Sequence, residues 1–459
     1  MPASETGTPP AAPSRLVGRL DRVFGVAAAG GTVGAELRGG LTTFATMAYI
    51  VVVNADMLSR AGIPFDSAVF ATCASAAVGT FLMAWWANYP FAMAPGMGIN
   101  AYFAFSVVPA VGAALGPGPP ERAWQVALGL VGWSGGLFLL ATWFEVRTKV
   151  MRGIPEALKL SMSAGIGLFI AFVGLQSAGV VVADPVTLVQ LGDIGAPAFW
   201  VAGAGLLLTG GLVARQVTGA LLWGVLATAA LAVAVGEAGL PAAWVALPAA
   251  SGSLLQWDLW GALDPRFLDI VVALLFVDFF DTMGTLLGVA VQGKFLDEEG
   301  NLPRDGRAMS ADATATVVGA ALGTPPVTTY VESAAGIAAG ARTGLANLVV
   351  VAGFLGAMFF APALAAVPSF ATAPALIVVG ALMTAGLARI DWGDGCDSLA
   401  AFVTTLAIPL TFSISDGMAL GVLTYVGAKA FAGKGREVSW IVWVLAAVFL
   451  LRYLFLPAD

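Results

Sequence analysis

The stretch VVALLFVDFFDTMGTLLGVA, residues 271–290, is long and apolar enough to cross a bilayer, yet it carries two carboxylates, Asp278 and Asp281. Even lenient insertion scales give an ionised carboxylate at the centre of a membrane helix a cost of about 2.5–3.5 kcal/mol. Their i,i+3 spacing places both on one helix face, which Thr282 and Thr285 share. We therefore expect a polar stripe that faces a substrate or proton site inside a polytopic membrane protein.

The composition of the whole chain agrees with this expectation. Hydrophobic residues make up 59% of the 459 residues and charged residues 11%, whereas soluble proteins carry about 25% charged residues. Two cysteines, Cys73 and Cys396, provide neither a disulfide framework nor a metal pattern. The absence of histidine excludes imidazole-based triads, zinc sites and proton relays, so a proton carried near neutral pH must be bound by a carboxylate.

The first 35 residues lack the apolar core of a signal peptide. They predict a disordered start followed by a short amphipathic segment, with Arg15, Arg19 and Arg22 on the cytoplasmic side. The connection 237–265 contains no Lys or Arg and is expected outside. This distribution of basic residues predicts a cytoplasmic N-terminus in a multi-pass protein of the cell membrane.

Apolar segments of the required length predict an all-α membrane fold of fourteen spans. Segment 267–291 begins a second set of seven, as segment 36–58 begins the first. An odd number of spans in each set makes the two halves inverted repeats. The role of a further apolar segment, 439–456, is left open: it crosses, lies in the interface or docks on the bundle.

The third span of each set is preceded by a Pro/Gly-rich interruption, FAMAPGMGINAYF (91–103) and LGTPPVTTYVESAAG (322–336). Interrupted segments at matching places in two halves point to the midplane site of a transporter. We expect an extended segment plus a half-helix at spans 3 and 10, facing one common cavity.

The polar residues at the two breaks suggest the class of ligand. Asn100 follows the first break and offers both a donor and an acceptor, and Glu332 follows the second. Tyr330 is placed to offer a ring face for stacking. Together with Asp278 and Asp281 these groups suit a flat, uncharged ligand with N–H groups and lone pairs, such as a nucleobase.

Several long motifs carry a resemblance to a known family: GGLTTFATMAYIVVVNADML (39–58), APGMGINAYF (94–103), GIPEALKLSMSAGIGLFIAFVGL (153–175), FVDFFDTMGTLLG (276–288) and TPPVTTYVESAAGIAAGARTGL (324–345). From about residue 15 to its end, the chain resembles the AzgA-like adenine–guanine–hypoxanthine permeases of the nucleobase–cation symporter (nucleobase–ascorbate transporter) family. The resemblance implies uptake of purine nucleobases coupled to protons, with no cofactor and no nucleic-acid partner. It leaves a homodimer open and places the protein in the bacterial inner membrane.

Individual site residues follow from the resemblance. It implies substrate binding by the motif residues Gly98, Asn100, Asp278, Asp281, Tyr330 and Glu332. Proton coupling is implied for Asp278, Glu332 and Asp312, although Asp312 also suits an ordinary cap at the cytoplasmic start of its span.

The resemblance further implies a core and a gate domain that move as in an elevator. The boundaries are 1–35 for the N-terminal segment, 36–146 (spans 1–4) and 266–366 (spans 8–11) for the core, 154–236 (spans 5–7) and 372–431 (spans 12–14) for the gate, and 439–456 for the C-terminal apolar helix. Small residues in spans 5 and 12, including Gly167 and Gly380, are expected to form the smooth face along which the core slides. Gly284 and Gly288 form a GxxxG pattern that predicts a close helix contact.

Three rival functions remain. A xanthine or uracil permease of the same fold is the nearest. An anion transporter of this fold is disfavoured because three carboxylates and no basic residue would repel anions. An intramembrane aspartyl enzyme is disfavoured because it needs its two aspartates on different helices, whereas Asp278 and Asp281 share one.

Overall fold

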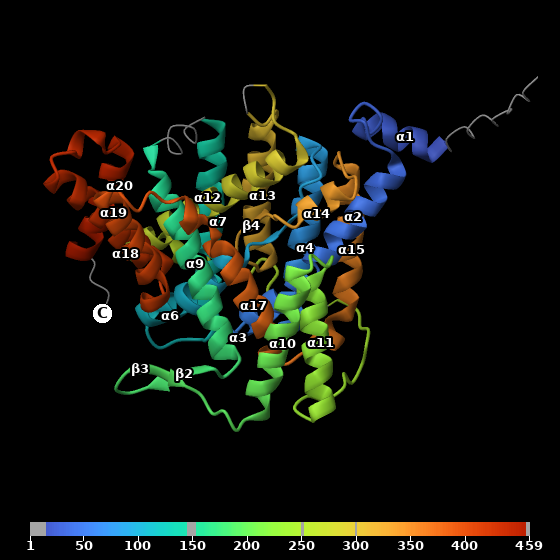
Figure 1. The fold of residues 1–459 in the computed structure, drawn as a ribbon, viewed down its shortest axis with the longest axis horizontal. Helices are drawn as coiled ribbons and strands as arrows, with labels where there is room; N and C mark the ends of the chain where they lie inside the picture. Colours follow the sequence, from blue (N-terminus) through green and yellow to red (C-terminus); the bar gives the residue numbers. More distant parts are fainter. Residues whose placement is uncertain (1–14, 145–152, 249–251, 299–300, 456–459) are drawn as a thin grey trace, which may run out of the picture.

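The computed structural model describes residues 15–144, 153–248, 252–298 and 301–455, and it is built almost entirely of helices (Figure 1). Residues 1–14, which the sequence predicts to be disordered, lie outside the described residues. The first half contains α1 (Arg15–Phe24), α2 (Val33–Met47), α3 (Tyr49–Arg60), α4 (Phe65–Leu82), α5 (Met97–Tyr102), α6 (Val108–Leu115), α7 (Glu121–Trp143), α9 (Glu156–Ser177), α10 (Pro197–Ala214) and α11 (Ala220–Val235). The second half contains α12 (Leu268–Gly293), α13 (Asp305–Leu322), α14 (Ser333–Ala338), α15 (Leu345–Ala357), α16 (Ala361–Ala365), α17 (Ser369–Met383), α18 (Gly395–Thr411), α19 (Ile414–Phe431) and α20 (Trp440–Phe455).

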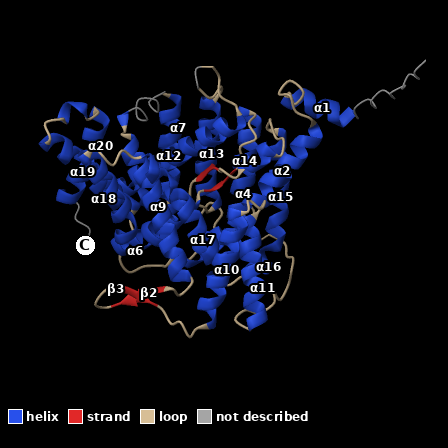
Figure 2. Ribbon diagram, in the orientation of Figure 1, coloured by secondary structure: helices blue, strands red, loops and turns tan. Residues whose placement is uncertain are grey.

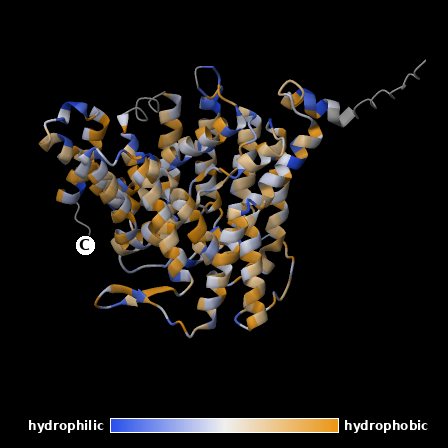
Figure 3. Cartoon of the chain, in the orientation of Figure 1, coloured by the Kyte–Doolittle hydropathy of each residue, from blue (hydrophilic) through white to orange (hydrophobic). Residues whose placement is uncertain are grey.

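Among the described residues, nine helical segments are long and apolar enough to cross a membrane, and three shorter apolar helices accompany them. One of the nine, Pro265–Gly293, includes α12 and therefore both Asp278 and Asp281. Hydropathy colouring shows apolar residues along most of the bundle and hydrophilic residues gathered in α1 and in the loop before α13 (Figure 3). The chain is thus a multi-pass membrane protein, as its composition predicts.

Both predicted interruptions are present as extended segments, and they pair with each other. Strand β1 (Met93–Pro95) runs antiparallel to β4 (Val327–Thr329), with Ala94 opposite Thr328. All six residues of these strands are buried, and the pair lies in the middle of the helices (Figure 2). Because each strand satisfies backbone groups of the other, extended chain can exist at this depth without exposing polar groups to lipid.

A second, peripheral hairpin was not predicted from the sequence. Strands β2 (Val181–Asp184) and β3 (Leu188–Leu191) pair beyond the end of α9 and lie at the lower edge of the view in Figure 1. Most of their residues are exposed. The hairpin is therefore a surface feature, away from the paired strands in the middle of the molecule.

The helices pack in two sets. Helix α9 packs most extensively against α17 and α18, and α10 packs against α11 and α17. In the other set, α13 packs against α7 and α4, and α15 against α2 and α4. Helix α20, whose role the sequence left open, docks mainly on α19.

Candidate substrate site

A cavity of about 310 Å³ lies between the two sets of helices, beside the paired strands. One wall is formed by α3, α12 and the segments around β1 and β4, and it contributes Tyr49, Gly96, Met97, Gly98, Asp281, Thr285 and residues 328–332. The facing wall is formed by α9, α11, α17 and the turn after α17, and it contributes Leu160, Ser163, Leu221, Val379, Leu382, Met383 and Gly386. The volume lies in the range of about 300–1,000 Å³ that is typical of small-molecule pockets.

Glu332 is half-buried in this cavity and is held by a tyrosine from the other half of the chain. The hydroxyl of Tyr49 donates a hydrogen bond of 2.9 Å to Glu332 Oε1. Tyr49 begins α3, and Glu332 directly precedes α14. The bond fixes the carboxylate at the cavity wall, where it can accept hydrogen bonds from a ligand.

Tyr330 lines the same cavity, as the sequence predicts. Its hydroxyl donates to the carbonyl oxygen of Pro95, at the end of β1. Because the hydroxyl is already bonded, the surface that Tyr330 can offer a ligand is its ring. Nearby, the hydroxyl of Ser333 accepts a hydrogen bond of 2.9 Å from the backbone N–H of Ala92, which ties the two breaks together once more.

Glycines at the first break allow close approach both to the facing helix α9 and to β4. A Cβ added at Gly98 would lie 2.4 Å from Cγ2 of Ile166 on α9, and one at Gly96 would lie 2.8 Å from Cγ2 of Thr328. Gly98 therefore lines the cavity as predicted, and it marks a point where the helix after β1 contacts the facing set of helices.

The two predicted aspartates of α12 lie in different surroundings. Asp281 is half-buried and lines the cavity, whereas Asp278 is fully buried and is not among the lining residues. Asp278 Oδ2 accepts a hydrogen bond of 3.1 Å from Thr316, whose hydroxyl also contacts the backbone of β4. Asp278 thus lies behind β4 rather than at the surface of the cavity.

Asp312 belongs to the same buried layer. It lies in the interior of α13, which begins at Asp305, so the alternative that it caps a helix is wrong. Its Oδ2 accepts a hydrogen bond of 2.8 Å from Thr282, whose hydroxyl also lies 2.8 Å from that of Thr328, a residue of the cavity wall. Asp278 of α12 and Asp312 of α13 are thus linked crosswise: Asp278 accepts from Thr316, four residues after Asp312, and Asp312 accepts from Thr282, four residues after Asp278.

Asn100 is buried one turn into α5 and does not line the cavity. Both polar atoms of its amide lack a hydrogen-bond partner among the described residues. A buried polar group left unpaired costs about 1–3 kcal/mol. Asn100 therefore retains its full hydrogen-bonding capacity beside the site without contacting the cavity in this conformation.

Comparison with known proteins shows which family the chain belongs to. The sequence profile of the Permease family (Xan_ur_permease) matches residues 34–420. The chain is 39% identical to the adenine permease AdeQ of Escherichia coli, covering 95% of this chain and 96% of that protein. It is 41% identical to the guanine/hypoxanthine permease PbuO of Bacillus subtilis, covering 91% and 96%. The chain belongs to this nucleobase permease family.

A further relative, the putative permease MJ0326 of Methanocaldococcus jannaschii, is 46% identical over 92% of the permease described here and 95% of its own length. Solved structures extend the likeness of fold. The transmembrane domain of the cyanobacterial bicarbonate transporter BicA gives a TM-score of 0.61 at 16% identity, covering 85% of this permease and 97% of that chain. The murine Solute Carrier 26 family member A9 anion transporter gives 0.61 at 12% identity, covering 93% and 74%. The family and its permease relatives show that the chain is a transporter and not an enzyme. Its fold is that of these anion carriers.

A second cavity of about 340 Å³ continues from the first in the permease. The two share the lining residues Leu160, Ser163, Asp281, Thr285 and Met383. The second cavity extends toward Glu156 and Arg389, an exposed ion pair with an N–O distance of 2.5 Å. We name it the vestibule, since it joins the substrate cavity to the end of the bundle where α9 begins.

Two expectations about glycines in the permease are wrong. Gly167 and Gly380 face each other: a Cβ at either would lie 2.6 or 2.3 Å from the carbonyl oxygen of the other. They close the contact between α9 and α17 within one set of helices and do not form a face toward the other set. Among the described residues, no atom lies within 4 Å of a Cβ added at Gly284 or Gly288, so their GxxxG pattern makes no close contact with the described part of the chain. Gly284 lines the vestibule.

Several residues of the permease cavity were missed from the sequence. Tyr49 stands in an apolar run with no charge to single it out. Thr328 lies within a break from which only the Pro and Gly residues, Tyr330 and Glu332 were singled out. Ser163 and Met383 come from the facing helices. The quoted motif 39–58 contains Tyr49, but its pairing with Glu332 depends on long-range packing.

Proposed function

We propose that this permease imports the purine nucleobases adenine, guanine and hypoxanthine by proton symport. The observation that carries the proposal is the cavity itself. It presents the carboxylates of Asp281 and Glu332 and the ring of Tyr330, and no Lys or Arg is among its described lining residues. Such a lining suits a neutral ligand with N–H donors and a flat face, and it would repel an anion.

The proposed roles follow from where each residue lies. Glu332 and Asp281 accept N–H donors of the base, Tyr330 stacks on its ring, and Gly98 leaves room for it. Asn100 is retained in the proposed site because its buried amide has both polar atoms available. The names of the adenine and guanine/hypoxanthine permease relatives support purines as the ligand class.

The coupled proton is proposed to reside on the buried carboxylates. Two neighbouring carboxylates that repel each other in a dry environment are more stable when one holds a proton. Asp278 and Asp312 lie on facing helices that are joined by the bonds of Thr316 to Asp278 and of Thr282 to Asp312, and the hydroxyls of Thr282 and Thr328 link Asp312 to the cavity wall. Glu332, which faces the ligand, completes the proposed proton-coupling set.

The proposed architecture is the fourteen-span inverted repeat, with a core of spans 1–4 and 8–11 and a gate of spans 5–7 and 12–14. The packing of α9 with α17 and α18, and of α13 with α7 and α4, supports this division. The antiparallel pairing of β1 with β4 is what two inverted repeats would give at their shared axis. Elevator-like movement of the core against the gate would expose the cavity to each side in turn, with the N-terminus in the cytoplasm of a bacterial cell.

Competition for uptake tests the substrate class. Membrane vesicles that contain the permease should take up radiolabelled hypoxanthine, and unlabelled adenine and guanine should compete for it more strongly than uracil. Vesicles that carry Glu332→Gln, matched for the amount of protein, serve as the control. Competition by uracil or xanthine but not by adenine or guanine would replace the purine assignment with that of a uracil or xanthine permease.

A further inference from the structure

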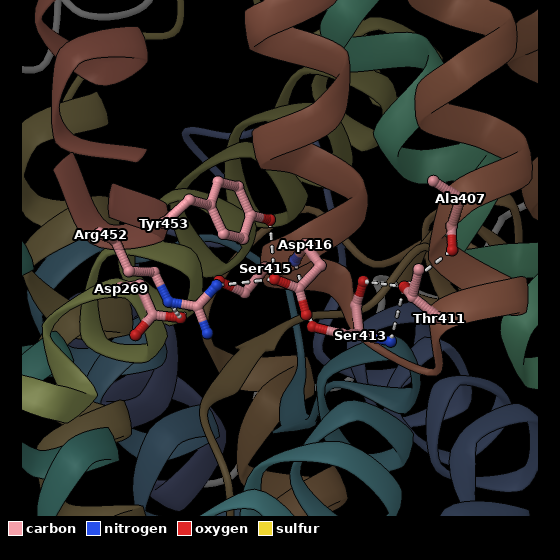
Figure 4. Close-up of polar contacts among 8 residues, drawn as sticks. All are labelled: Asp269, Ala407, Thr411, Ser413, Ser415, Asp416, Arg452 and Tyr453. Atoms are coloured by element: carbon pink, nitrogen blue, oxygen red, sulfur yellow. Dashed lines mark hydrogen bonds and ion pairs between the residues drawn. The ribbon is translucent and has the colours of Figure 1, made fainter. Parts of the chain in front are cut away.

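One ion cluster joins the two sets of helices at a distance from the substrate cavity (Figure 4). We name it the Arg452 cluster: Asp269 of α12, Ser415 and Asp416 of α19, and Arg452 and Tyr453 of α20. Its members line neither the substrate cavity nor the vestibule. The proposed transport mechanism assigns them no role.

The guanidinium of Arg452 bridges two carboxylates from different helices. Its Nη1 lies 2.7 Å from Asp416 Oδ1, and its Nε lies 3.1 Å from Asp269 Oδ2. The hydroxyl of Tyr453 donates to Asp416 Oδ1 at 2.8 Å, and that of Ser415 donates to Asp269 Oδ2 at 2.9 Å. Since α20 packs mainly on α19, the bond from Arg452 to Asp416 is internal to one set, whereas its bond to Asp269 crosses to the other.

The contact that crosses between the two sets, Arg452 with Asp269, leaves one carboxylate oxygen without a hydrogen bond. Asp269 is 3% exposed, and its Oδ1 finds no hydrogen-bond donor among the described residues. An ion pair buried with an unpaired oxygen gains less than a fully bonded one, because part of the desolvation cost is not compensated. The contact between Arg452 and Asp269 is therefore suited to breaking and reforming.

The position of the cluster along α12, relative to the vestibule, indicates what this contact does. Asp269 lies in the first turn of α12, Asp281 lines the substrate cavity, and Met283 and Leu287 line the vestibule. At 1.5 Å per residue, Asp269 and Met283 are about 21 Å apart along the helix. The cluster thus joins the two sets at one end of α12 while the vestibule separates them toward the other end.

We propose that Arg452 is a latch: its bond to Asp269 holds the two sets of helices together at the end of the bundle where α12 begins, while the vestibule toward the other end is open. Breaking its bond to Asp269 then accompanies the movement that exposes the substrate to the other side. This inference rests on the alternating-access movement in the proposed function. Arg452 is a positioning residue, since it acts through α12 and does not contact substrate.

Access to the vestibule tests the latch directly and needs no substrate. In a background with Cys73→Ala and Cys396→Ser, the substitution Met283→Cys places a thiol in the vestibule. Its rate of reaction with a membrane-impermeant maleimide reports how often the vestibule is open. Adding Arg452→Gln should lower this rate at least three-fold, because loss of the latch moves the population toward the conformation with a closed vestibule.

Arg266, three residues before Asp269, offers a matched control. Arg266 pairs with Asp264 at 2.7 Å and donates to the carbonyl of Ala114, so this ion pair does not join α12 to α19. Arg266→Gln should leave the labelling rate unchanged. A rate for Arg452→Gln that equals or exceeds that of Arg266→Gln would overturn the latch.

One further variant keeps the test decisive. Asp269→Asn removes the crossing charge while preserving shape, and it should lower labelling as Arg452→Gln does, which covers the case in which Arg452→Gln does not reach the membrane. Equilibrium purine binding should stay within three-fold of wild type in both. A lowered labelling rate in both variants of a protein that binds no purine would contradict the proposed substrate and leave the latch standing. Purine binding with unaltered labelling in both variants would contradict the latch.

Discussion

The hydroxyl of Tyr49 donates a hydrogen bond of 2.9 Å to Oε1 of Glu332, across 283 positions of sequence. It joins the start of α3 to the segment that follows β4, so each half of the chain contributes one partner. The carboxylate proposed to recognise substrate is thereby positioned by a residue from the other half of the chain. The site depends on both halves being correctly packed.

Tyr49→Phe should weaken purine binding by about ten-fold. A hydrogen bond to a charged group contributes about 1.5–3 kcal/mol, and 1.4 kcal/mol corresponds to a factor of ten in affinity. Isothermal titration calorimetry on the purified protein would measure the change. Tyr425→Phe, which removes a hydroxyl from α19 outside the cavity, is the matched control and should bind normally. Equal affinities for the two variants would show that Tyr49 does not position Glu332.

Asp312→Asn should uncouple transport from protons. The substitution removes one of the two buried carboxylates of α12 and α13 and keeps an acceptor for Thr282. We expect accumulation against a gradient to be lost while exchange of internal for external purine continues. Both are measured in the same vesicles, with Asp297→Asn in an exposed loop as the control. Proton-driven accumulation that survives Asp312→Asn would exclude this residue from the coupling set.

Gly98→Ala should lower transport at least ten-fold, because its Cβ would lie 2.4 Å from Cγ2 of Ile166. Ile166→Ala removes the conflicting atom, so the double variant should recover much of the lost uptake. Comparison of the two single variants with the double variant gives the coupling between the positions. Strictly additive losses would mean that this contact between α5 and α9 does not limit the movement.

Much of this fold follows from local sequence, and much of the site does not. Apolar length predicts the membrane helices, and the Pro/Gly runs at 91–103 and 322–336 predict the two breaks, because both signals act over a few residues. The pairing of β1 with β4 and the bond between Tyr49 and Glu332 join distant segments, and no local pattern specifies them. The α12 carboxylates were recognised from their i,i+3 spacing within an apolar segment, but only packing distinguishes Asp281 in the cavity from Asp278 behind β4.

The prediction made from Gly167 and Gly380 was wrong for the same reason, since local sequence does not specify contacts between distant segments. Small residues in α9 and α17 indicate that a backbone approaches closely, but not which backbone it is. In the structure Gly167 and Gly380 approach each other, so the sliding face predicted from them does not exist at that point.

Gly167→Ala should therefore reduce stability rather than slow a sliding step. Its Cβ would lie 2.6 Å from the Gly380 carbonyl and 2.7 Å from Cβ of Met383, and overpacking of this kind costs about 1–3 kcal/mol. Thermal unfolding in detergent should show a lower midpoint. Gly211→Ala on α10, where an added Cβ meets no atom of the described residues within 4 Å, should leave the midpoint unchanged or raise it slightly. A stable Gly167→Ala protein that transports slowly would restore the original sliding interpretation.

The central claim is that the carboxylate-lined cavity couples purine uptake to protons, and uptake by purified permease in proteoliposomes tests it most directly. An inward proton gradient should drive accumulation of radiolabelled hypoxanthine, an uncoupler should abolish it, and Glu332→Gln should eliminate it in a protein that remains folded. Accumulation that follows a sodium gradient and persists with the uncoupler, or that is undiminished in Glu332→Gln, would contradict the account.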